Sequence, residues 1–424
     1  MSKTETIHTP KGCVDIYGED VVIWQHIEAI IAQTCERFCV NEIRTPIFEY
    51  TEVFKRDKAD SSDMVTKEMY TFYDKGSRSL TLKPEGTAPV VRFFNENNVS
   101  QKGLPCKLYY ITDCFRYENP ASGRQRQFHQ FGVEYFGVDS VSGEAEIIAL
   151  ATILFQRLGI NNYKVHINSL GDKECRSAYN EVLKEFLVAN EHKLCNACIE
   201  RMNKNPLRTL DCKNESCQDI LQHAPKTLDT LGDSCKAEFE MLLEKLDNIG
   251  IEYVIDKTLV RGLDYYNKTV FEFIADDSLA GGTICAGGRY DYLVEELGGV
   301  PTKSVGFGLG LERLVILYKL LEESITTVKP TLYIGSIGVK GQSLAEKISL
   351  DMRLNGLKVE CNINNRIVKA QMKYADKIDS EFSLIIGDDE VEKKILPIRN
   401  METGEVFEVV YDDEYLDNMI NAFY

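Results

Sequence analysis

Polar side chains that could hold a ligand are concentrated between Lys107 and Gly137. They are Arg116, Arg124, Arg126, Gln130 and Glu134. If Gln130 and Glu134 lie on a strand, their even spacing places them on one face together with Gly132. A guanidinium, an amide and a carboxylate on one face could bind a zwitterionic ligand that carries a phosphate. A surface hairpin with solvated charges is the alternative that this stretch alone leaves open.

A second candidate site is the tetrapeptide Pro-Glu-Gly-Thr at residues 84–87. Proline and glycine keep Glu85 and Thr87 out of regular structure, so both side chains could face a ligand. A carboxylate beside a hydroxyl suits an α-ammonium group. Alternatively, Thr87 caps a helix over Ala88–Asn95, in whose first turn Pro89 is tolerated. The two interpretations are compatible.

Hydrophobic patterning predicts the elements that must position these residues. Both ends of Lys107–Gly137 alternate apolar and polar residues and are rich in Tyr, Phe, Ile and Val, which predicts two strands. Glu118–Arg126 contains proline and glycine and is predicted to be the loop of an antiparallel hairpin. Upstream, Asp20–Val40 has the apolar spacing of an amphipathic helix. Asn41–Tyr50 is predicted to be one strand, at a sheet edge or a bulge because it contains Pro46.

The rest of the chain divides into three regions by pattern. The elements predicted up to residue 321 are a hairpin of Met69–Tyr73 and Ser79–Leu82, the helix Gly143–Leu158, strands over Tyr163–Leu170, Ile251–Leu263, Thr269–Ala275 and the Gly-rich Gly281–Asp291, and a strand running into a helix over Ser304–Leu321. Asp172–Ile249 is charged and helical and interrupts them. After Lys329, strands and helices alternate, which predicts an α/β domain with a largely parallel core. The predicted domains are 1–325, interrupted by an insertion at 172–249, and 329–424.

Composition bounds the class of protein. The chain has 424 residues, of which 44% are hydrophobic, and this is enough for two or three packed domains. The net charge of −17 argues against broad, non-specific nucleic-acid binding but leaves room for a local basic patch. No apolar run approaches the roughly 18 residues of a membrane span, and the polar N-terminus contains no signal-peptide core. The 13 cysteines are an odd number and suit reduced thiols. We therefore expect a soluble, cytoplasmic protein with no membrane partner.

Several motifs resemble those of the class II aminoacyl-tRNA synthetases. The hairpin, with Phe-Arg-x-Glu before its loop and Gly-Arg-x-Arg at the end of the loop, resembles motif 2; residues 41–50 resemble the dimer-forming motif 1, and residues 304–321 resemble motif 3. Arg-Gly-Leu-Asp-Tyr-Tyr at 261–266 and Ala-Gly-Gly-Arg-Tyr-Asp at 286–291 resemble two signatures of the histidyl-tRNA synthetases. The resemblance implies an α+β fold: a class II catalytic core, in which helices flank an antiparallel sheet, with a helical insertion and a C-terminal α/β anticodon-binding domain.

The resemblance also implies a reaction. ATP and L-histidine would form histidyl-adenylate and pyrophosphate, and the histidyl group would then pass to the 3′ end of tRNA(His). Mg²⁺ would accompany ATP, and the chain would act as a homodimer. The alternative is a non-catalytic, synthetase-like regulatory subunit of histidine biosynthesis. The presence of Arg261 and of the C-terminal domain weighs against that alternative.

Residue roles follow from the same resemblance. The catalytic residues would be Arg116 and Arg261. The ATP-binding residues would be Arg116, Arg124 and Arg313. The histidine-binding residues would be Glu85, Gly86, Thr87, Arg116, Gln130, Glu134, Arg261, Tyr265, Tyr266 and Tyr290. Many bacterial relatives have an arginine before the loop-tip proline and a glutamine after it, and this chain has neither in Glu118–Ser122. The tRNA elements that the tip reads therefore stay open.

Four cysteines of the insertion raise the question of zinc. Cys195 and Cys198 have the C-x-x-C spacing of a zinc ligand pair, whereas Cys212 and Cys217 are separated by four residues, which is a poorer spacing. The spacing favours ordinary reduced thiols over a structural zinc ion. The proposed chemistry needs no metal bound by the protein.

Overall fold

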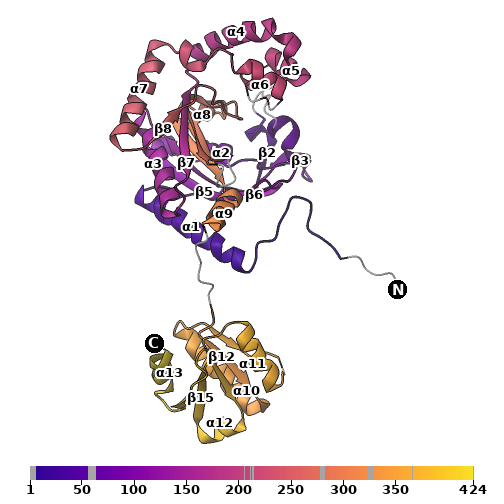
Figure 1. The fold of residues 1–424 in the computed structure, drawn as a ribbon, viewed down its shortest axis with the longest axis vertical. Coiled ribbons are helices and arrows are strands. Elements are labelled where there is room, and N and C mark those ends of the chain that lie inside the picture. Colours follow the sequence, from indigo (N-terminus) through magenta and orange to yellow (C-terminus); the bar gives the residue numbers. More distant parts are fainter. Residues whose placement is uncertain are drawn as a thin grey trace, which may run out of the picture. The chain divides into compact units, whose positions relative to one another are not determined.

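The computed structural model describes residues 6–55, 64–204, 206–210, 212, 214–276, 282–321, 329–364 and 366–423. The chain forms two compact units, Met1–Ser324 and Ile325–Tyr424 (Figure 1). Among the described residues, no helix combines the length and the hydropathy that crossing a bilayer requires.

An eight-stranded sheet is the centre of the first unit. Its strands are β1 (Asn41–Glu42), β5 (Cys106–Phe115), β6 (Gln127–Phe136), β7 (Tyr163–Ser169), β8 (Tyr253–Ile255), β9 (Asn267–Ala275), β10 (Gly282–Arg289) and β11 (Ser304–Gly310). They lie in the order β1-β5-β6-β11-β10-β9-β7-β8. The edge pairs β1–β5 and β7–β8 are parallel, and the other pairs are antiparallel. Strands β5 and β6 form the predicted hairpin, paired from Cys106 opposite Phe136 to Phe115 opposite Gln127.

A small second sheet explains why one strand prediction was wrong. Asn41–Tyr50 is not a single strand, because β1 joins the large sheet and β2 (Phe48–Tyr50) joins a three-stranded sheet with β4 (Ser79–Leu82) and β3 (Tyr70–Tyr73). Pro46 lies between β1 and β2 and has no N–H to donate to a ladder. Ile251–Leu263 is also shorter than predicted: only β8 is a strand, and Asp256 then accepts the N–H of Thr258 at 2.9 Å to form a turn.

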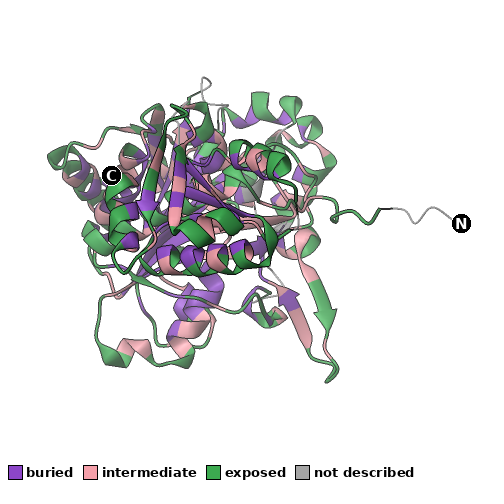
Figure 2. Ribbon diagram, turned by 90° about the horizontal axis from the view of Figure 1, so that it is seen from below, coloured by how far each residue is buried: buried purple, intermediate pink, exposed green. Residues whose placement is uncertain are grey.

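Helices cover the large sheet. They are α1 (Glu19–Arg37), α2 (Thr87–Glu96), α3 (Ser142–Arg157), α8 (Leu293–Glu296) and α9 (Leu311–Leu320). The buried stripe of α1 contains Trp24, Ile27 and Ile31, the spacing that the sequence predicted for its core face. In Figure 2 the strands are mainly buried, and the outward faces of the helices are exposed.

The segment 172–249 is helical, as predicted. It contains α4 (Lys173–Ala189), α5 (Asn196–Lys204), α6 (Glu215–Leu221) and α7 (Asp233–Asn248). Helices α4, α5 and α6 lie together at the top of Figure 1 and share an apolar cluster that includes Leu183, Leu187, Met202 and Ile220. This segment belongs to the first compact unit. Whether it is an independent domain stays a prediction.

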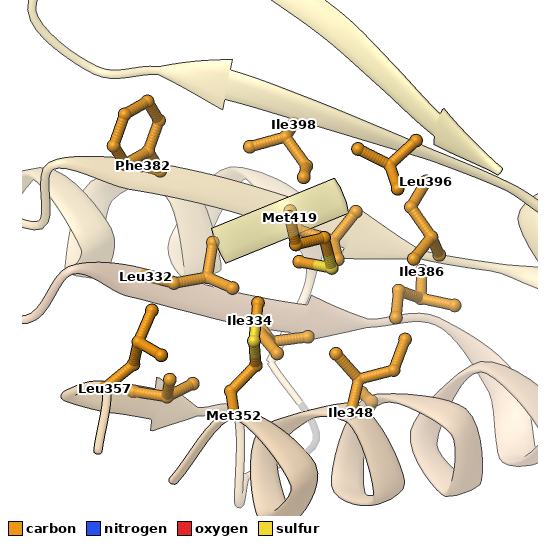
Figure 3. Packing of buried hydrophobic residues seen from close by; sticks show 14 of the residues in the cluster. Leu332, Ile334, Ile348, Met352, Leu357, Phe382, Ile386, Leu396, Ile398 and Met419 are labelled. Carbon is orange, nitrogen blue, oxygen red and sulfur yellow. The ribbon is translucent and has the colours of Figure 1, made fainter. Parts of the chain in front are cut away.

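The second unit is an α/β structure around a five-stranded sheet. Its strands are β12 (Leu332–Ser336), β13 (Val359–Cys361), β14 (Phe382–Ile386), β15 (Ile395–Asn400) and β16 (Val406–Val410), and its helices are α10 (Gly338–Leu354), α11 (Val368–Lys377), α12 (Asp388–Lys393) and α13 (Tyr415–Phe423). Strands β13, β12 and β14 are parallel, as predicted, while β15 and β16 extend the sheet in antiparallel fashion. Figure 3 shows strand residues such as Ile334 packed with Ile348 and Met352 of α10 and Met419 of α13.

Candidate active site

Strands β6 and β11 form the floor of a pocket. Their register places Gln130, Gly132 and Glu134 opposite Gly310, Gly308 and Gly306, respectively. A Cβ atom on Gly306 would lie 1.9 Å from Oε2 of Glu134, and one on Gly308 would lie 2.3 Å from Nε2 of Gln130. The glycines of β11 therefore leave the space that these two polar side chains occupy.

The pocket above this floor has a volume of about 190 Å³. The predicted residues that line it are Glu85, Thr87, Arg116, Gln130, Arg261, Tyr265 and Tyr266. They come from the start of α2, the β5–β6 hairpin and the loop before β9, so the fold joins three segments that are far apart in sequence. The other predicted residues (Gly86, Arg124, Glu134, Tyr290 and Arg313) are not among those that line this pocket.

Glu134 lies behind the pocket wall and is fully buried. Its carboxylate accepts hydrogen bonds from the hydroxyls of Tyr290 at 2.5 Å, Thr87 at 2.7 Å and Tyr110 at 3.2 Å. Burial raises the pKa of Glu134 to about 8, although the donors on Tyr290 and Thr87 act in the opposite direction. Sequence reasoning missed Tyr110, whose place opposite Gly132 in the hairpin was the available signal.

The Pro-Glu-Gly-Thr tetrapeptide is fixed by its backbone. Helix α2 begins at Thr87, and the carboxylate of Glu85 accepts the N–H groups of Thr87 at 2.6 Å and Ala88 at 2.8 Å. The prediction that the Thr87 hydroxyl caps the helix was wrong, because Glu85 satisfies these first N–H groups and the hydroxyl is directed to Glu134 instead. The N–H of Gly86 donates to Oε1 of Gln130 at 3.0 Å, which fixes the amide on the pocket floor.

The two arginines predicted to be catalytic both reach the pocket. Arg116 donates from Nε to the carbonyl of Pro84 at 2.8 Å, so its guanidinium is held at the rim. Arg261 forms an ion pair with Glu272 through Nη1, and its guanidinium carbon lies 5.3 Å from the centre of the Tyr266 ring. Its Nε is buried and has no hydrogen-bond partner among the described residues. Buried donors without partners are rare, so this N–H is available to an oxyanion of a ligand.

Arg124 and Arg313 lie near each other outside the pocket lining. Helix α9 is tied to β6 by Glu312, whose carboxylate accepts the backbone N–H of His129 at 2.9 Å and lies 2.8 Å from Nδ1 of the same residue. The next residue along the helix, Arg313, has a lowered pKa because it is partly buried and because Arg124 adds a second positive charge. The fold thus concentrates positive charge between the hairpin loop and the start of α9.

Arg289 of the second signature motif is buried in an ion pair and is not among the residues that line the pocket. It is 3% exposed and makes a two-pronged ion pair with Glu144 of α3, at 2.6 Å from Nε and 2.5 Å from Nη2. This pair anchors the end of β10 against α3. The residue that follows Arg289 is Tyr290, whose hydroxyl donates to Glu134.

Comparisons with known proteins show the family to which the chain belongs. A family model described as histidyl-tRNA synthetase matches residues 12–314. The chain belongs to the histidyl-tRNA synthetase family. A second model, described as an anticodon binding domain, matches residues 332–417. The predicted family and the predicted α+β class II fold are therefore confirmed.

Individual histidyl-tRNA synthetases match over nearly the whole chain. The histidine–tRNA ligase of Acetivibrio thermocellus is 49% identical over 406 residues, which covers 95% of this chain and 97% of that one. The histidine–tRNA ligase of Clostridium novyi is 47% identical, with coverages of 95% and 96%. The crystal structure of apo S. aureus histidyl-tRNA synthetase has a TM-score of 0.82 and 36% identity, and the match covers 99% of this chain and 100% of that chain.

Proposed function

We propose that this chain is a histidine–tRNA ligase. It activates L-histidine with ATP to give histidyl-adenylate and pyrophosphate, and then transfers histidine to the 3′ end of tRNA(His) in the cytoplasm. The observation that carries this proposal is a pocket with two chemically different ends. On one side, the buried carboxylate of Glu134 lies behind the wall and accepts the hydroxyl of the lining residue Thr87. Elsewhere the lining has two guanidinium groups, one with a buried N–H that has no partner among the described residues.

The buried end suits an imidazole ring. A neutral imidazole has one N–H donor and one acceptor nitrogen. Glu134 accepts the ring N–H, and the hydroxyl of Tyr266 donates to the other nitrogen, while Tyr265 and Tyr290 shape the walls. Rings lacking either group would leave a buried polar partner unsatisfied, and such a mismatch costs about 10⁴–10⁵-fold in specificity in sites built this way.

Three residues that line the pocket suit the α-ammonium group of the amino acid. Each carboxylate oxygen of Glu85 accepts one backbone N–H and keeps a further lone pair. Thr87 and Gln130 add oxygen atoms beside it. Because backbone contacts of Gly86, Thr87 and Ala88 fix this group, it is positioned before the ligand arrives.

The arginines suit the nucleotide. Arg116 and Arg261 hold the α-phosphate and the histidine carboxylate, whose oxygen attacks the phosphorus as the bond to the β-phosphate oxygen breaks and pyrophosphate leaves. Arg124 and Arg313 hold the β- and γ-phosphates. No protein nucleophile is needed, since fixed positive charge and positioning supply the catalysis.

Mg²⁺ fits this scheme as an ion that enters with ATP. The described carboxylates at the pocket already have partners: Glu85 binds two backbone N–H groups, and Glu272 binds Arg261 and the hydroxyl of Thr283. The ion would neutralise charge on the phosphates and would reach the site with ATP, as Mg²⁺ commonly does at nucleotide sites.

A homodimer is the assembly that we propose. What supports it is the three-stranded sheet, whose inner face has Glu49 paired with Arg92 at 2.5 Å and whose outer face is apolar. The exposed aromatic residues of that outer face are Phe48 at 51%, Tyr50 at 52% and Phe72 at 41%. Such a face is usually covered by a partner, and a second copy is the partner that the motif 1 resemblance of residues 41–50 implies.

Mass measurement in solution tests the dimer. Phe72→Glu should shift the wild-type dimer towards monomer, because a charge would be buried in an apolar contact. Tyr73→Glu, on the same strand but on the opposite face, is the matched control and should stay dimeric. A wild-type chain that is monomeric at micromolar concentration would contradict the proposed assembly.

Pyrophosphate exchange with ATP across the twenty amino acids tests the reaction. Exchange that depends on histidine alone is the expected result. Histidine binding without exchange for any amino acid would instead favour the regulatory subunit. In the same proposal, residues 172–249 form an inserted domain and residues 329–424 bind the anticodon; deletion of the second unit should lower transfer to tRNA while exchange persists.

A further inference from the structure

Four cysteines outside the active site converge in the helical segment. Cys195 immediately precedes α5 and Cys198 lies in its first turn, while Cys212 precedes α6 and Cys217 lies near its start. Their Sγ atoms all lie within 4.8 Å of one another. Cys198 and Cys217 are fully buried, Cys212 is 8% exposed, and Cys195 is half-buried. The sequence spacing of Cys212 and Cys217 is a poor match to a zinc ligand pair, but the fold brings their sulfur atoms close to each other and to those of Cys195 and Cys198.

The distances match a tetrahedral metal site. With Zn–S bonds of about 2.3 Å, tetrahedral geometry places neighbouring sulfur atoms about 3.8 Å apart. The Sγ atoms of Cys195 and Cys212 are 3.8 Å apart. A disulfide would need about 2.05 Å, so this pair is too far apart to be one. Four thiols arranged around a common centre fit one cation better than they fit two disulfides.

The surroundings also suit thiolates. The backbone N–H of Cys195 donates to Sγ of Cys217 at 3.2 Å, an outer contact that orients a ligand and offsets its charge. Helix α5 begins at the cluster, between Cys195 and Cys198, and helix N-termini favour thiolates. No carboxylate or histidine of the described residues joins the four sulfurs in the cluster.

We propose that Cys195, Cys198, Cys212 and Cys217 bind one Zn²⁺ ion. Binding releases the thiol protons to solvent and leaves a tetrathiolate complex with a net charge of −2. All four ligands come from the protein and the cluster is largely buried, so the site is closed to substrate and structural. It joins the start of α5 to the start of α6, two short helices that also share an apolar cluster with α4.

A neighbouring group of possible ligands serves as an internal comparison. Asp172, Cys175 and Cys235 also lie within ligand distance of one another. However, Oδ1 of Asp172 caps α4 by accepting the N–H of Cys175 at 3.0 Å, and Sγ of Cys175 accepts the N–H of Gly232 at 3.2 Å. Among the residues that the structure describes, this group has three possible ligands, and two of them already have structural partners. The zinc site is therefore assigned to the four-cysteine cluster.

Zinc analysis of the full-length protein, purified under reducing conditions, tests the proposal. We expect one zinc per chain by elemental analysis, released when a mercurial reagent blocks the thiols and detected with a metal indicator. Reconstitution with Co²⁺ should give the strong visible absorption of a tetrahedral tetrathiolate complex. Substoichiometric zinc together with no such cobalt spectrum would overturn the proposal and leave four reduced, packed thiols.

Two variants test whether zinc binds to the four-cysteine cluster or to the neighbouring group of Asp172, Cys175 and Cys235. Cys217→Ser should lose the zinc and the cobalt spectrum, and limited proteolysis should then cut within residues 172–249 faster than in the wild type. Cys235→Ser removes an equally buried thiol and is the matched control, which should keep one zinc per chain. Loss of zinc from Cys235→Ser with retention in Cys217→Ser would overturn the assignment. If Cys217→Ser does not fold, mercurial release from the wild type still decides the result.

Discussion

Replacing Glu134 with glutamine should stabilise the free protein at alkaline pH and weaken histidine binding. The carboxyl is fully buried, and burial raises its pKa from 4.5 to about 8. Below pH 4.5 both the folded and the unfolded chain hold the proton, so the carboxyl costs nothing. As the pH rises towards 8, the unfolded chain releases the proton while the folded chain retains it, and the free energy of unfolding falls.

The size of the effect follows from that pKa difference. Once both states are ionised, the cost is about 5 kcal/mol, and about 3.5 kcal/mol of it accumulates between pH 5 and pH 8. Glutamine has nearly the shape of the protonated acid and does not titrate. The variant and the wild type should therefore be similar at pH 5, and the variant should be more stable at pH 8. Unlike Glu134, glutamine cannot release a proton when histidine binds and so cannot become an anionic acceptor for an imidazole N–H; affinity for histidine should therefore fall.

Urea denaturation at pH 5 and pH 8 measures the difference, because all other titrating groups cancel between variant and wild type. Calorimetric titration with histidine measures the binding loss. Glu181→Gln, on the exposed side of α4, controls for the loss of one negative charge. A stability difference that is the same at both pH values would refute the reasoning, since it would show that Glu134 does not hold a proton in the folded state that the unfolded chain releases.

Three further predictions concern the rest of the site. Arg261→Ala should reduce pyrophosphate exchange by about 10²–10³-fold while circular dichroism stays unchanged, because the oxyanion loses a fixed charge; retained exchange would contradict the role of Arg261. Gly306→Ala should destabilise the first unit by about 1–3 kcal/mol in thermal denaturation, because the added Cβ would lie 1.9 Å from Glu134 and 2.6 Å from a backbone oxygen. Glu144→Ala should cost about 1–3 kcal/mol in urea denaturation, because the buried Arg289 loses its two-pronged partner and keeps only Asp291 and two backbone carbonyls; no measurable cost would argue against a buried pair.

Local patterns were sufficient for most elements of the fold. The alternation in Lys107–Gly137 predicted the β5–β6 hairpin, and the strand–helix alternation after Lys329 predicted the parallel part of the second sheet. Local patterns failed where one predicted strand divides between two different sheets. Asn41–Tyr50 reads as one strand, yet its two ends pair with different sheets, and only tertiary contacts decide that division.

The candidate site was predicted as a set of residues but not as a set of contacts. Sequence resemblance brought Thr87 and Tyr290 to attention, while only the fold directs both hydroxyls to one carboxylate. It also drew attention to the motif that contains Arg289, whose partner Glu144 is remote in sequence. The space for Glu134 comes from Gly306 across a ladder, which requires the β6–β11 register.

The sequence by itself determined the family, the type and order of most elements, and the residue types available for chemistry, because periodicity and motifs are properties of neighbouring residues. The tertiary structure decided which polar groups are desolvated and which meet. Glu134 has its raised pKa because packing buries its carboxyl completely, which outweighs the opposite effect of the hydroxyl donors that the fold directs to it. The four cysteines form a ligand set only because α5 and α6 begin at the same point. Burial and long-range distance depend on packing, and no local pattern contains them.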